Sequence, residues 1–204
     1  MHSISKLQAI IQQAIAETSY PENPKELYQP ISYLMDLGGK RMRPVSLLMA
    51  CNLFTDDISK ALKPAIAIEV FHNFTLMHDD IMDNAPLRRG QPTVHSKWNN
   101  NVAILSGDVM LVEAYKLIMQ VDLPILPDVL NIFNETAVGV CEGQQIDMNF
   151  EKLQHVTEAE YLNMIRLKTA VLLAASLKIG ALIGGSSKND ADLLYEFGIN
   201  LGLA

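Results

Sequence analysis

The sequence FHNFTLMHDDIMD, at residues 71–83, is the stretch from which the fold and the chemistry of the chain can be worked out. If it is helical, Asp79 and Asp83 lie one turn apart on the same face, with Asp80 beside them. We therefore expect a cluster of three carboxylates at the C-terminal end of a helix, where the helix dipole favours cations. Hard oxygen ligands at this spacing suit Mg2+, which completes its shell with waters and phosphate oxygens. The pattern predicts a metal-dependent diphosphate site.

Most acidic clusters are solvated or cap a helix, and Asp56 and Asp57 form one such pair. We assign that pair to a helix start, because no third carboxylate accompanies it. The cluster at residues 79–83 differs, because Arg88 and Arg89 follow it closely in a loop that contains proline and glycine. These arginines can simply be salt-bridged to the aspartates. Phosphate recognition explains more, because the planar guanidinium fork matches phosphate oxygens.

A second basic segment, GGKRMRP, occupies residues 38–44. Pro44 can be the first residue of a helix, which places Lys40, Arg41 and Arg43 in a short turn at the helix N-terminus. Such a turn offers free backbone N–H groups, a favourable dipole and three cations, and so predicts an anion site. The alternative is a turn whose basic side chains are merely solvated.

Composition limits the classes of protein to consider. The 204 residues, 49% hydrophobic and 19% charged, suffice for one globular domain with a substantial core. The formal net charge of -7 argues against nucleic acid as the main partner, since such proteins usually present a basic face. No stretch resembles a signal peptide, and the most apolar segment, 170–183, is shorter than the roughly 20 residues of a membrane span. We interpret Cys51 and Cys141 as reduced, buried thiols of a cytoplasmic protein.

Hydrophobic periodicity and helix-breaking residues predict a chain made of helices. The predicted helices occupy residues 4–15, 25–37, 45–54, 64–83, 101–121, 128–150, 158–184 and 190–204. Thr157 and Glu160 form a capping box at the start of the seventh. We find no strand pattern or internal repeat, and residues 84–95 are predicted to be a loop. We expect an all-α fold, an antiparallel helix bundle around a central cavity.

Three polar residues in the later helices concern this cavity. Gln144 and Asp147 are three apart, so they share one helix face and can look into a wet cavity; the alternative is plain surface. Lys168 stands just before an apolar run, and its spacing alone favours a lysine that extends to solvent.

The motifs, taken in order, resemble those of the trans-isoprenyl diphosphate synthases, the polyprenyl synthetase family that includes geranylgeranyl and farnesyl diphosphate synthases. They are GGKRMRP at 38–44, HDDIMD at 78–83, LRRGQPTVH at 87–95, GQQID at 143–147 and LKT at 167–169. The resemblance covers nearly the whole chain. It implies the isoprenoid synthase fold, usually a homodimer, and an enzyme that condenses isopentenyl diphosphate with an allylic diphosphate to a short-chain (C15–C20) product.

The resemblance also implies roles for individual residues. Asp79 and Asp83 match ligands of Mg2+, two or three ions in the complete enzyme, and Asp80 is a weaker match. Arg88 matches the arginine of the allylic diphosphate. The residues that match the isopentenyl diphosphate pocket are Lys40, Arg43, His72 and Arg89.

Further matches concern the reacting end of the allylic substrate. Lys168 matches a lysine on the leaving group, and Thr169 places a carbonyl near the developing cation. Gln144 and Asp147 match polar residues of the same cavity. No protein nucleophile is required for this chemistry, which agrees with the absence of a Ser/His/Asp or Cys/His arrangement.

Product length in the family depends on the size of the side chains just upstream of the first aspartate motif. Phe74 stands five residues before Asp79 and is followed by Thr75. Phe74 should block very long chains, and the motif lacks a two-residue insertion typical of bacterial farnesyl synthases. We therefore favour a C20 product over C15.

The family carries a second aspartate-rich motif, which should follow GINLGLA at 198–204. We therefore expect residues 1–204 to be the N-terminal portion of a single synthase domain that lacks full competence by itself. Two alternatives stay open. A terpene cyclase would have no use for a second diphosphate pocket, and a non-catalytic partner subunit would not need a complete first motif.

Overall fold

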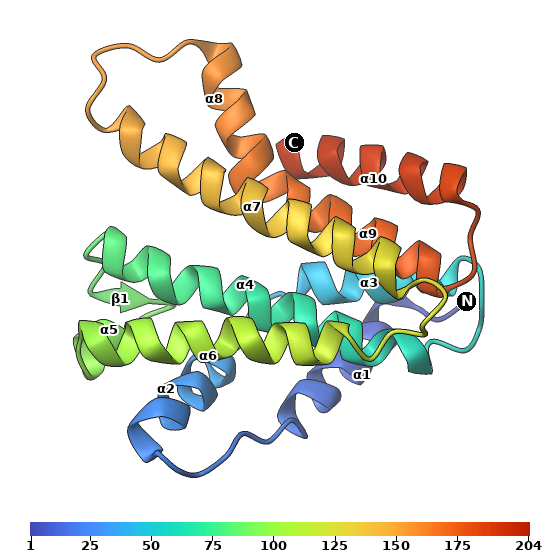
Figure 1. Ribbon diagram of the computed structural model, residues 1–204, viewed down its shortest axis with the longest axis horizontal. Helices are drawn as coiled ribbons and strands as arrows, with labels where there is room; N and C mark the ends of the chain where they lie inside the picture. Colours follow the sequence, from blue (N-terminus) through green and yellow to red (C-terminus); the bar gives the residue numbers. More distant parts are fainter.

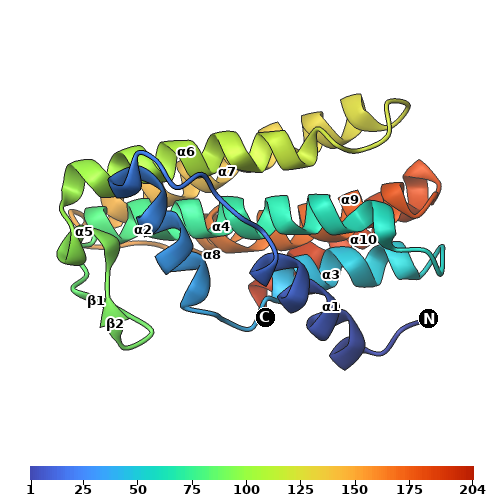
Figure 2. The ribbon, with the colours of Figure 1, turned by 90° about the horizontal axis from the view of Figure 1, so that it is seen from below.

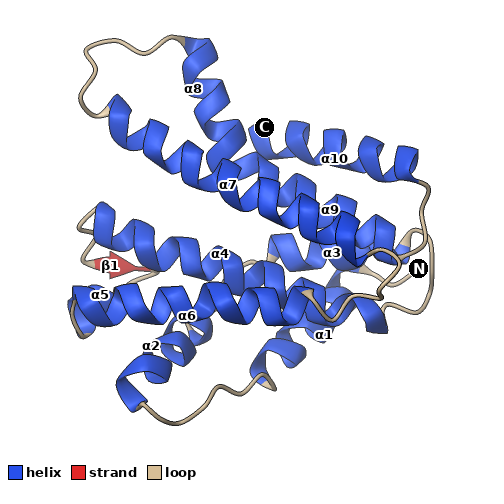
Figure 3. Ribbon diagram, viewed as in Figure 1, coloured by secondary structure: helices blue, strands red, loops and turns tan.

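The computed structural model describes residues 1–204 and is helical almost throughout, which confirms the predicted all-α class (Figure 1, Figure 3). The helices are α1 (Ile4–Ala16), α2 (Lys25–Asp36), α3 (Met42–Asn52), α4 (Leu62–Met82), α5 (Val94–Lys97), α6 (Asn100–Ile118), α7 (Leu126–Phe150), α8 (Glu158–Ile165), α9 (Val171–Ile183) and α10 (Lys188–Leu203). A 3-10 turn, η1 (Ser59–Ala61), precedes α4, and a π-helical segment, η2 (Arg166–Ala170), joins α8 to α9. Two short strands, β1 (Leu87–Arg88) and β2 (Gln91–Pro92), complete the fold.

The helix predicted at 158–184 is divided into α8 and α9 by η2, and two further predictions differ from the structure. The third helix begins at Met42, so Pro44 is its third residue rather than its first. The predicted loop 84–95 contains an antiparallel hairpin, in which Leu87 pairs with Pro92 and Arg88 with Gln91. Its two-residue turn, Arg89 and Gly90, has positive φ at both positions, the geometry that closes a tight hairpin. The capping box of Thr157 and Glu160 is present as predicted.

Helix α4 lies between the other helices and is buried along much of its length (Figure 1, Figure 2). It packs against α6 on one side and α3 on another. Phe71 of α4 meets Phe133 of α7 edge-to-face, with ring centroids 5.2 Å apart, and both rings are buried. Because α4 carries the aspartates, the core fixes their position.

Two glycines let helices approach one another closely. A Cβ on Gly143 of α7 would overlap the backbone of Lys168 in η2, and one on Gly180 of α9 would overlap the Leu47 carbonyl of α3. The first contact brings Lys168 against α7 at a π-helical segment, a feature that often marks functional sites.

The prediction of buried cysteines holds for Cys51 and is wrong for Cys141, which is exposed. Val140 and Gly143 of α7 are buried on one face of the helix, so Cys141, which lies between them, turns toward solvent. Neither cysteine is in a disulfide.

Among the helices, none combines the length and the apolar character that crossing a lipid bilayer requires.

Gly180→Ala should lower the free energy of unfolding by roughly 1–3 kcal/mol, because the added methyl group overlaps the α3 backbone. Gly139→Ala is a matched control: its Cβ would lie 3.6 Å from Leu167, an ordinary contact, and alanine favours a helix by about 1 kcal/mol over glycine. Urea unfolding of both variants measures the difference. Equal losses in the two variants would contradict the close packing of α9 on α3.

Candidate functional site

A cavity of about 120 Å³ opens between α4, α7 and the π-helical segment η2. Helix α4 contributes side chains at helical spacing along one face: His72, Thr75, Leu76 and Asp79. The other walls bring residues from four elements: Arg43, Val140, Gln144, Lys168, Thr169 and Leu172. A larger groove, about 560 Å³, lies along α7, α9 and α10 but contains none of the predicted site residues. The smaller cavity is therefore the candidate site.

Asp79 and Asp83 form the acidic end of the site. The Asp83 N–H donates to the Asp79 carbonyl over 2.8 Å, so the two residues are one turn apart, and Asp83 is exposed just beyond α4. The pKa of Asp79 is raised to about 6, chiefly by burial; Asp83 and Asp80 contribute to the rise, and Lys168 and Arg88 oppose it. Two hard carboxylates at a partly exposed helix end fit Mg2+, which needs only one or two protein ligands.

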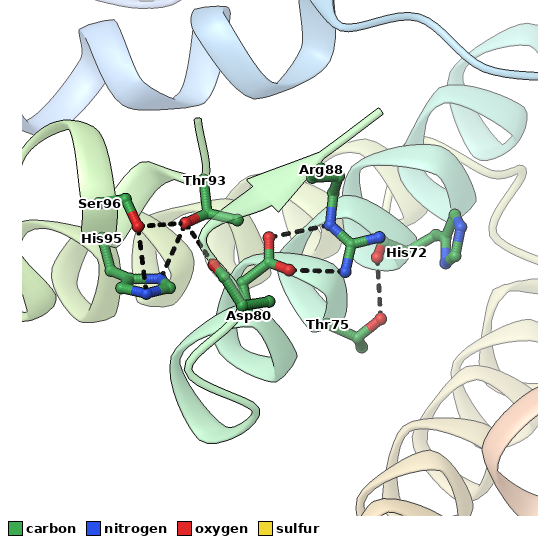
Figure 4. Close-up of polar contacts among 8 residues, drawn as sticks. His72, Thr75, Asp80, Arg88, Thr93, His95 and Ser96 are labelled. Atoms are coloured by element: carbon green, nitrogen blue, oxygen red, sulfur yellow. Dashed lines mark hydrogen bonds and ion pairs between the residues drawn. The ribbon is translucent and has the colours of Figure 1, made fainter. Parts of the chain in front are cut away.

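The predicted cluster of three carboxylates does not form, because the structure gathers no group of three His, Cys, Asp or Glu side chains around a common point. Asp80 is 2% exposed and accepts hydrogen bonds from Arg88 Nε (2.8 Å) and Nη2 (2.7 Å), as Figure 4 shows. One residue along a helix rotates a side chain by about 100°, so Asp80 faces the hairpin rather than the cavity. The salt bridge that the sequence left as an alternative is therefore present.

The hairpin that carries Arg88 is fixed at its base. The buried Thr93 hydroxyl donates to the Ala85 carbonyl over 2.7 Å, and the Thr93 N–H donates to the Pro86 carbonyl over 3.1 Å (Figure 4). The Tyr33 hydroxyl of α2 donates to the Pro92 carbonyl over 2.8 Å. These contacts hold the strands in place from two sides.

Basic groups collect at the other end of the cavity. Arg43 Nη1 lies 3.4 Å from His72 Nε2, and Arg43 Nε is buried without a hydrogen-bond partner. The Arg89 guanidinium abuts Gly39, where a Cβ would lie only 2.8 Å from Nη2. Burial, followed by Arg43 and the other arginines, lowers the pKa of His72 from 6.5 to about 3. Several donors and a neutral imidazole thus face a space suited to an anion.

The turn at residues 38–41 presents fewer cations to the site than predicted. Lys40 is exposed and lies in a separate groove beside α1. Arg41 is buried and paired with Glu69 of α4, so it is not a free cation of the turn. The sequence analysis missed Glu69, although a single acid inside the apolar run at 65–71 signals a buried partner.

Lys168 lines the cavity, so the prediction from spacing that it extends to solvent is wrong. Its Nζ lies 2.5 Å from Asp147 Oδ2, and the contact between α7 and η2 brings the two residues together. Gln144 is buried in the cavity wall, and its Oε1 has no hydrogen-bond partner. Asp147 itself is outside the lining of the cavity.

Phe74 and Thr75 take different positions. Thr75 lines the cavity, and its hydroxyl donates to the His72 carbonyl over 2.8 Å (Figure 4). Phe74 packs edge-to-face on His78, with centroids 4.8 Å apart, and lies 5.6 Å from Phe71. His78 in turn fits against Gly107 of α6, a contact that the sequence analysis missed.

The chain is similar in sequence and in fold to known proteins. The profile of the family described as polyprenyl synthetase matches residues 24–204. A geranylgeranyl diphosphate synthase of Methanosarcina mazei is 44% identical over 192 residues, covering 93% of this chain and 59% of that protein. A geranylfarnesyl diphosphate synthase of Natronomonas pharaonis is 36% identical over 220 residues, covering 99% of this chain and 64% of that protein.

A solved structure agrees with these matches. The crystal structure of a geranylgeranyl pyrophosphate synthase has a TM-score of 0.96 and 46% identity, and covers 100% of this chain and 62% of that one. The chain thus spans between 59% and 64% of the length of these three relatives.

We expect the His72 ring to stay neutral from about pH 5 to 8, because burial and the nearby guanidiniums lower its pKa from 6.5 to about 3. Imidazole nitrogen shifts measured by NMR across this range should therefore not change. Arg43→Met removes the nearest of these positive charges and should raise the pKa of His72. A His72 midpoint above pH 5 in the unsubstituted protein would contradict the described environment.

Proposed function

The chain belongs to the polyprenyl synthetase family, and on that premise we propose that it is part of a prenyltransferase. The enzyme condenses isopentenyl diphosphate with an allylic diphosphate to a short all-trans product in the C15–C20 range. Residues 1–204 form the N-terminal portion of a single synthase domain. The names of the relatives, geranylgeranyl and geranylfarnesyl diphosphate synthases, support a short-chain product.

One observation carries the proposal: an acidic group and basic groups face the same cavity, and the protein does not fully pair them with groups of opposite charge or with hydrogen-bond partners. Burial opposes the negative charge of Asp79, and Arg43 keeps a buried donor without a partner. A diphosphate accompanied by Mg2+ would supply an anion to the basic end and a cation to the acidic end.

Ionisation of an allylic diphosphate leaves a carbocation and a diphosphate, so the departing group needs positive charge. We assign this role to Arg88, held by Asp80, and to Lys168, which lines the cavity. Mg2+ held by Asp79 and Asp83 would add Lewis-acid neutralisation of the same group.

The second substrate occupies the basic end of the cavity. Arg43, His72 and Arg89 bind the diphosphate of isopentenyl diphosphate, whereas Lys40, in the separate groove beside α1, would have to turn toward it. The neutral His72 ring can donate one N–H to a phosphate oxygen without titrating. This second pocket supports a synthase over a terpene cyclase, which binds only one diphosphate.

The cation itself is protected by the remaining wall. Val140, Leu172 and Thr169 line the cavity. We assign to the two apolar side chains the exclusion of water and to the Thr169 carbonyl the stabilisation of the developing charge. Gln144 adds polar atoms to the same wall, and Asp147 holds the Lys168 ammonium group.

A homodimer is also part of the proposal. Leu105 and Val112 of α6 and Met119, the residue just after this helix, are 57%, 58% and 56% exposed and lie seven residues apart. Seven residues make about two turns, so they form one apolar stripe, which a second copy of the chain would cover. A cytoplasmic location stays a prediction.

The direct test uses the protein expressed from the whole reading frame that encodes residues 1–204. Incubation with Mg2+, isopentenyl diphosphate and farnesyl diphosphate should give a longer prenyl diphosphate, and chelation of Mg2+ should abolish the reaction. Asp79→Asn should lower kcat by about two orders of magnitude, because it removes stabilisation of the leaving group. Asp56→Asn, which changes an exposed aspartate in the loop after α3, is the matched control.

The products separate the alternatives. Cyclic hydrocarbons or alcohols would indicate a terpene cyclase. Binding of both diphosphates without turnover would indicate a non-catalytic subunit.

Phe74→Ala should lengthen the main product by one or more isoprene units, because it opens space beside the α4 helix where the growing tail is proposed to descend. Chromatography of the dephosphorylated products measures the shift. Phe54→Ala, which truncates a partly exposed ring at the end of α3, should leave the distribution unchanged. An unchanged distribution in the Phe74 variant would remove this residue from the control of product length.

A further inference from the structure

A buried ion pair lies just outside the cavity, between the turn at residues 38–41 and α4. Arg41 and Glu69 are 7% and 2% exposed, and Arg41 Nη1 donates to Glu69 Oε1. Arg41 Nη2 donates to the Met35 carbonyl at the end of α2 over 2.6 Å. Neither side chain lines the cavity, so neither is placed to touch a ligand there.

Asn73 extends this pair along α4. Its Nδ2 donates to Glu69 Oε1 over 3.0 Å and to the Glu69 carbonyl over 2.8 Å, and the side chain is fully buried. The carboxylate of Glu69 therefore accepts from both Arg41 and Asn73. The Arg41–Glu69 pair thus joins α4 to the turn and, through Arg41, to the end of α2.

The turn itself is strained and needs such a support. Gly38, Gly39 and Arg41 have φ values of 72°, 141° and 50°. The left-handed conformation is unfavourable for a residue with a Cβ, as in Arg41, which also lacks a side-chain cap on α3. The Arg41 side chain is thus the anchor that holds its own backbone in this conformation.

The residues on either side of Arg41 are those of the basic end. Two residues later, Arg43 reaches His72; two residues earlier, Gly39 abuts the Arg89 guanidinium. A change in the backbone at Arg41 would move both contacts together.

We propose that Arg41 and Glu69 are positioning residues for the isopentenyl diphosphate pocket, which set the placement of Arg43 and Arg89 without contacting the substrate. The inference rests on the proposed function of that pocket. Loss of the pair should weaken binding of isopentenyl diphosphate and leave the allylic site, built on Asp79 and Arg88, nearly unaffected.

A purely structural role predicts something else. Removal of one partner of a buried pair is destabilising, whereas replacement of both partners by apolar residues of similar volume often restores stability. The double variant Arg41→Met with Glu69→Met therefore separates stability from positioning.

The experiment compares the single variants Arg41→Met and Glu69→Met, the double variant and the unsubstituted protein, expressed from the whole reading frame. We expect both single variants to unfold at lower urea concentration and the double variant to recover. In the double variant, KM for isopentenyl diphosphate should stay raised by about 10-fold to 100-fold, with KM for farnesyl diphosphate within about twofold of the unsubstituted value. The control is the double variant Lys60→Met with Asp122→Met, which removes an exposed ion pair. It should change neither the urea concentration of unfolding nor KM for isopentenyl diphosphate.

A second readout does not depend on catalysis. Calorimetric titration with inorganic pyrophosphate should show about 10-fold weaker binding to the double variant than to the unsubstituted protein. If the unsubstituted protein binds pyrophosphate but makes no prenyl product, the proposed function fails while this comparison still decides the role of the pair. A stable double variant with unchanged KM and pyrophosphate affinity would overturn the proposal, as would an unsubstituted protein that does not bind pyrophosphate.

Discussion

Helix α4 buries two carboxylates, Glu69 and Asp80, and each is paired with one arginine of a neighbouring turn. A buried charge cannot be left alone without a large cost in stability, so each of these acids needs its arginine. The two pairs determine which basic residues near the cavity are already bound to an acid. Arg41 is wholly occupied, Arg88 is held in a fixed orientation by Asp80, and Arg43 has no acid partner. The arrangement of the acids therefore decides which cations are free to meet a ligand.

Sequence periodicity was sufficient for the helices and for Asp79 and Asp83, because both follow from the repeat of a single helix. Periodicity was not sufficient to predict which charged side chains form ion pairs, because these pairs join segments that meet only in the folded chain. Arg41 was therefore counted with the free cations of its turn. The position of Asp80 was within reach of simple geometry, because neighbouring residues on a helix point in different directions. The hairpin could not be predicted, because its strands are too short to show an alternating pattern of polar and apolar residues.

The close approach of distant helices explains the remaining differences. The local sequence predicts that Lys168 is a surface lysine. In the structure, Gly143 lets α7 lie directly against Lys168, and Asp147 of α7 becomes its ion-pair partner. Such a contact depends on the absence of a side chain on another helix, which no local pattern reveals. The motifs named these residues through resemblance, while the packing explains how several of them, far apart in sequence, come to line one cavity.

The hairpin that bears Arg88 is tied down by Thr93 and by Tyr33 of α2. A basic loop that is already rigid loses little conformational entropy when an anion arrives, so association need not wait for the loop to fold. The rate of encounter then depends on local electrostatic attraction, in a chain whose formal net charge is -7. Salt screens the attraction of the guanidiniums of this loop and the repulsion of the acidic surface together, so its two effects on the arrival of an anion oppose one another.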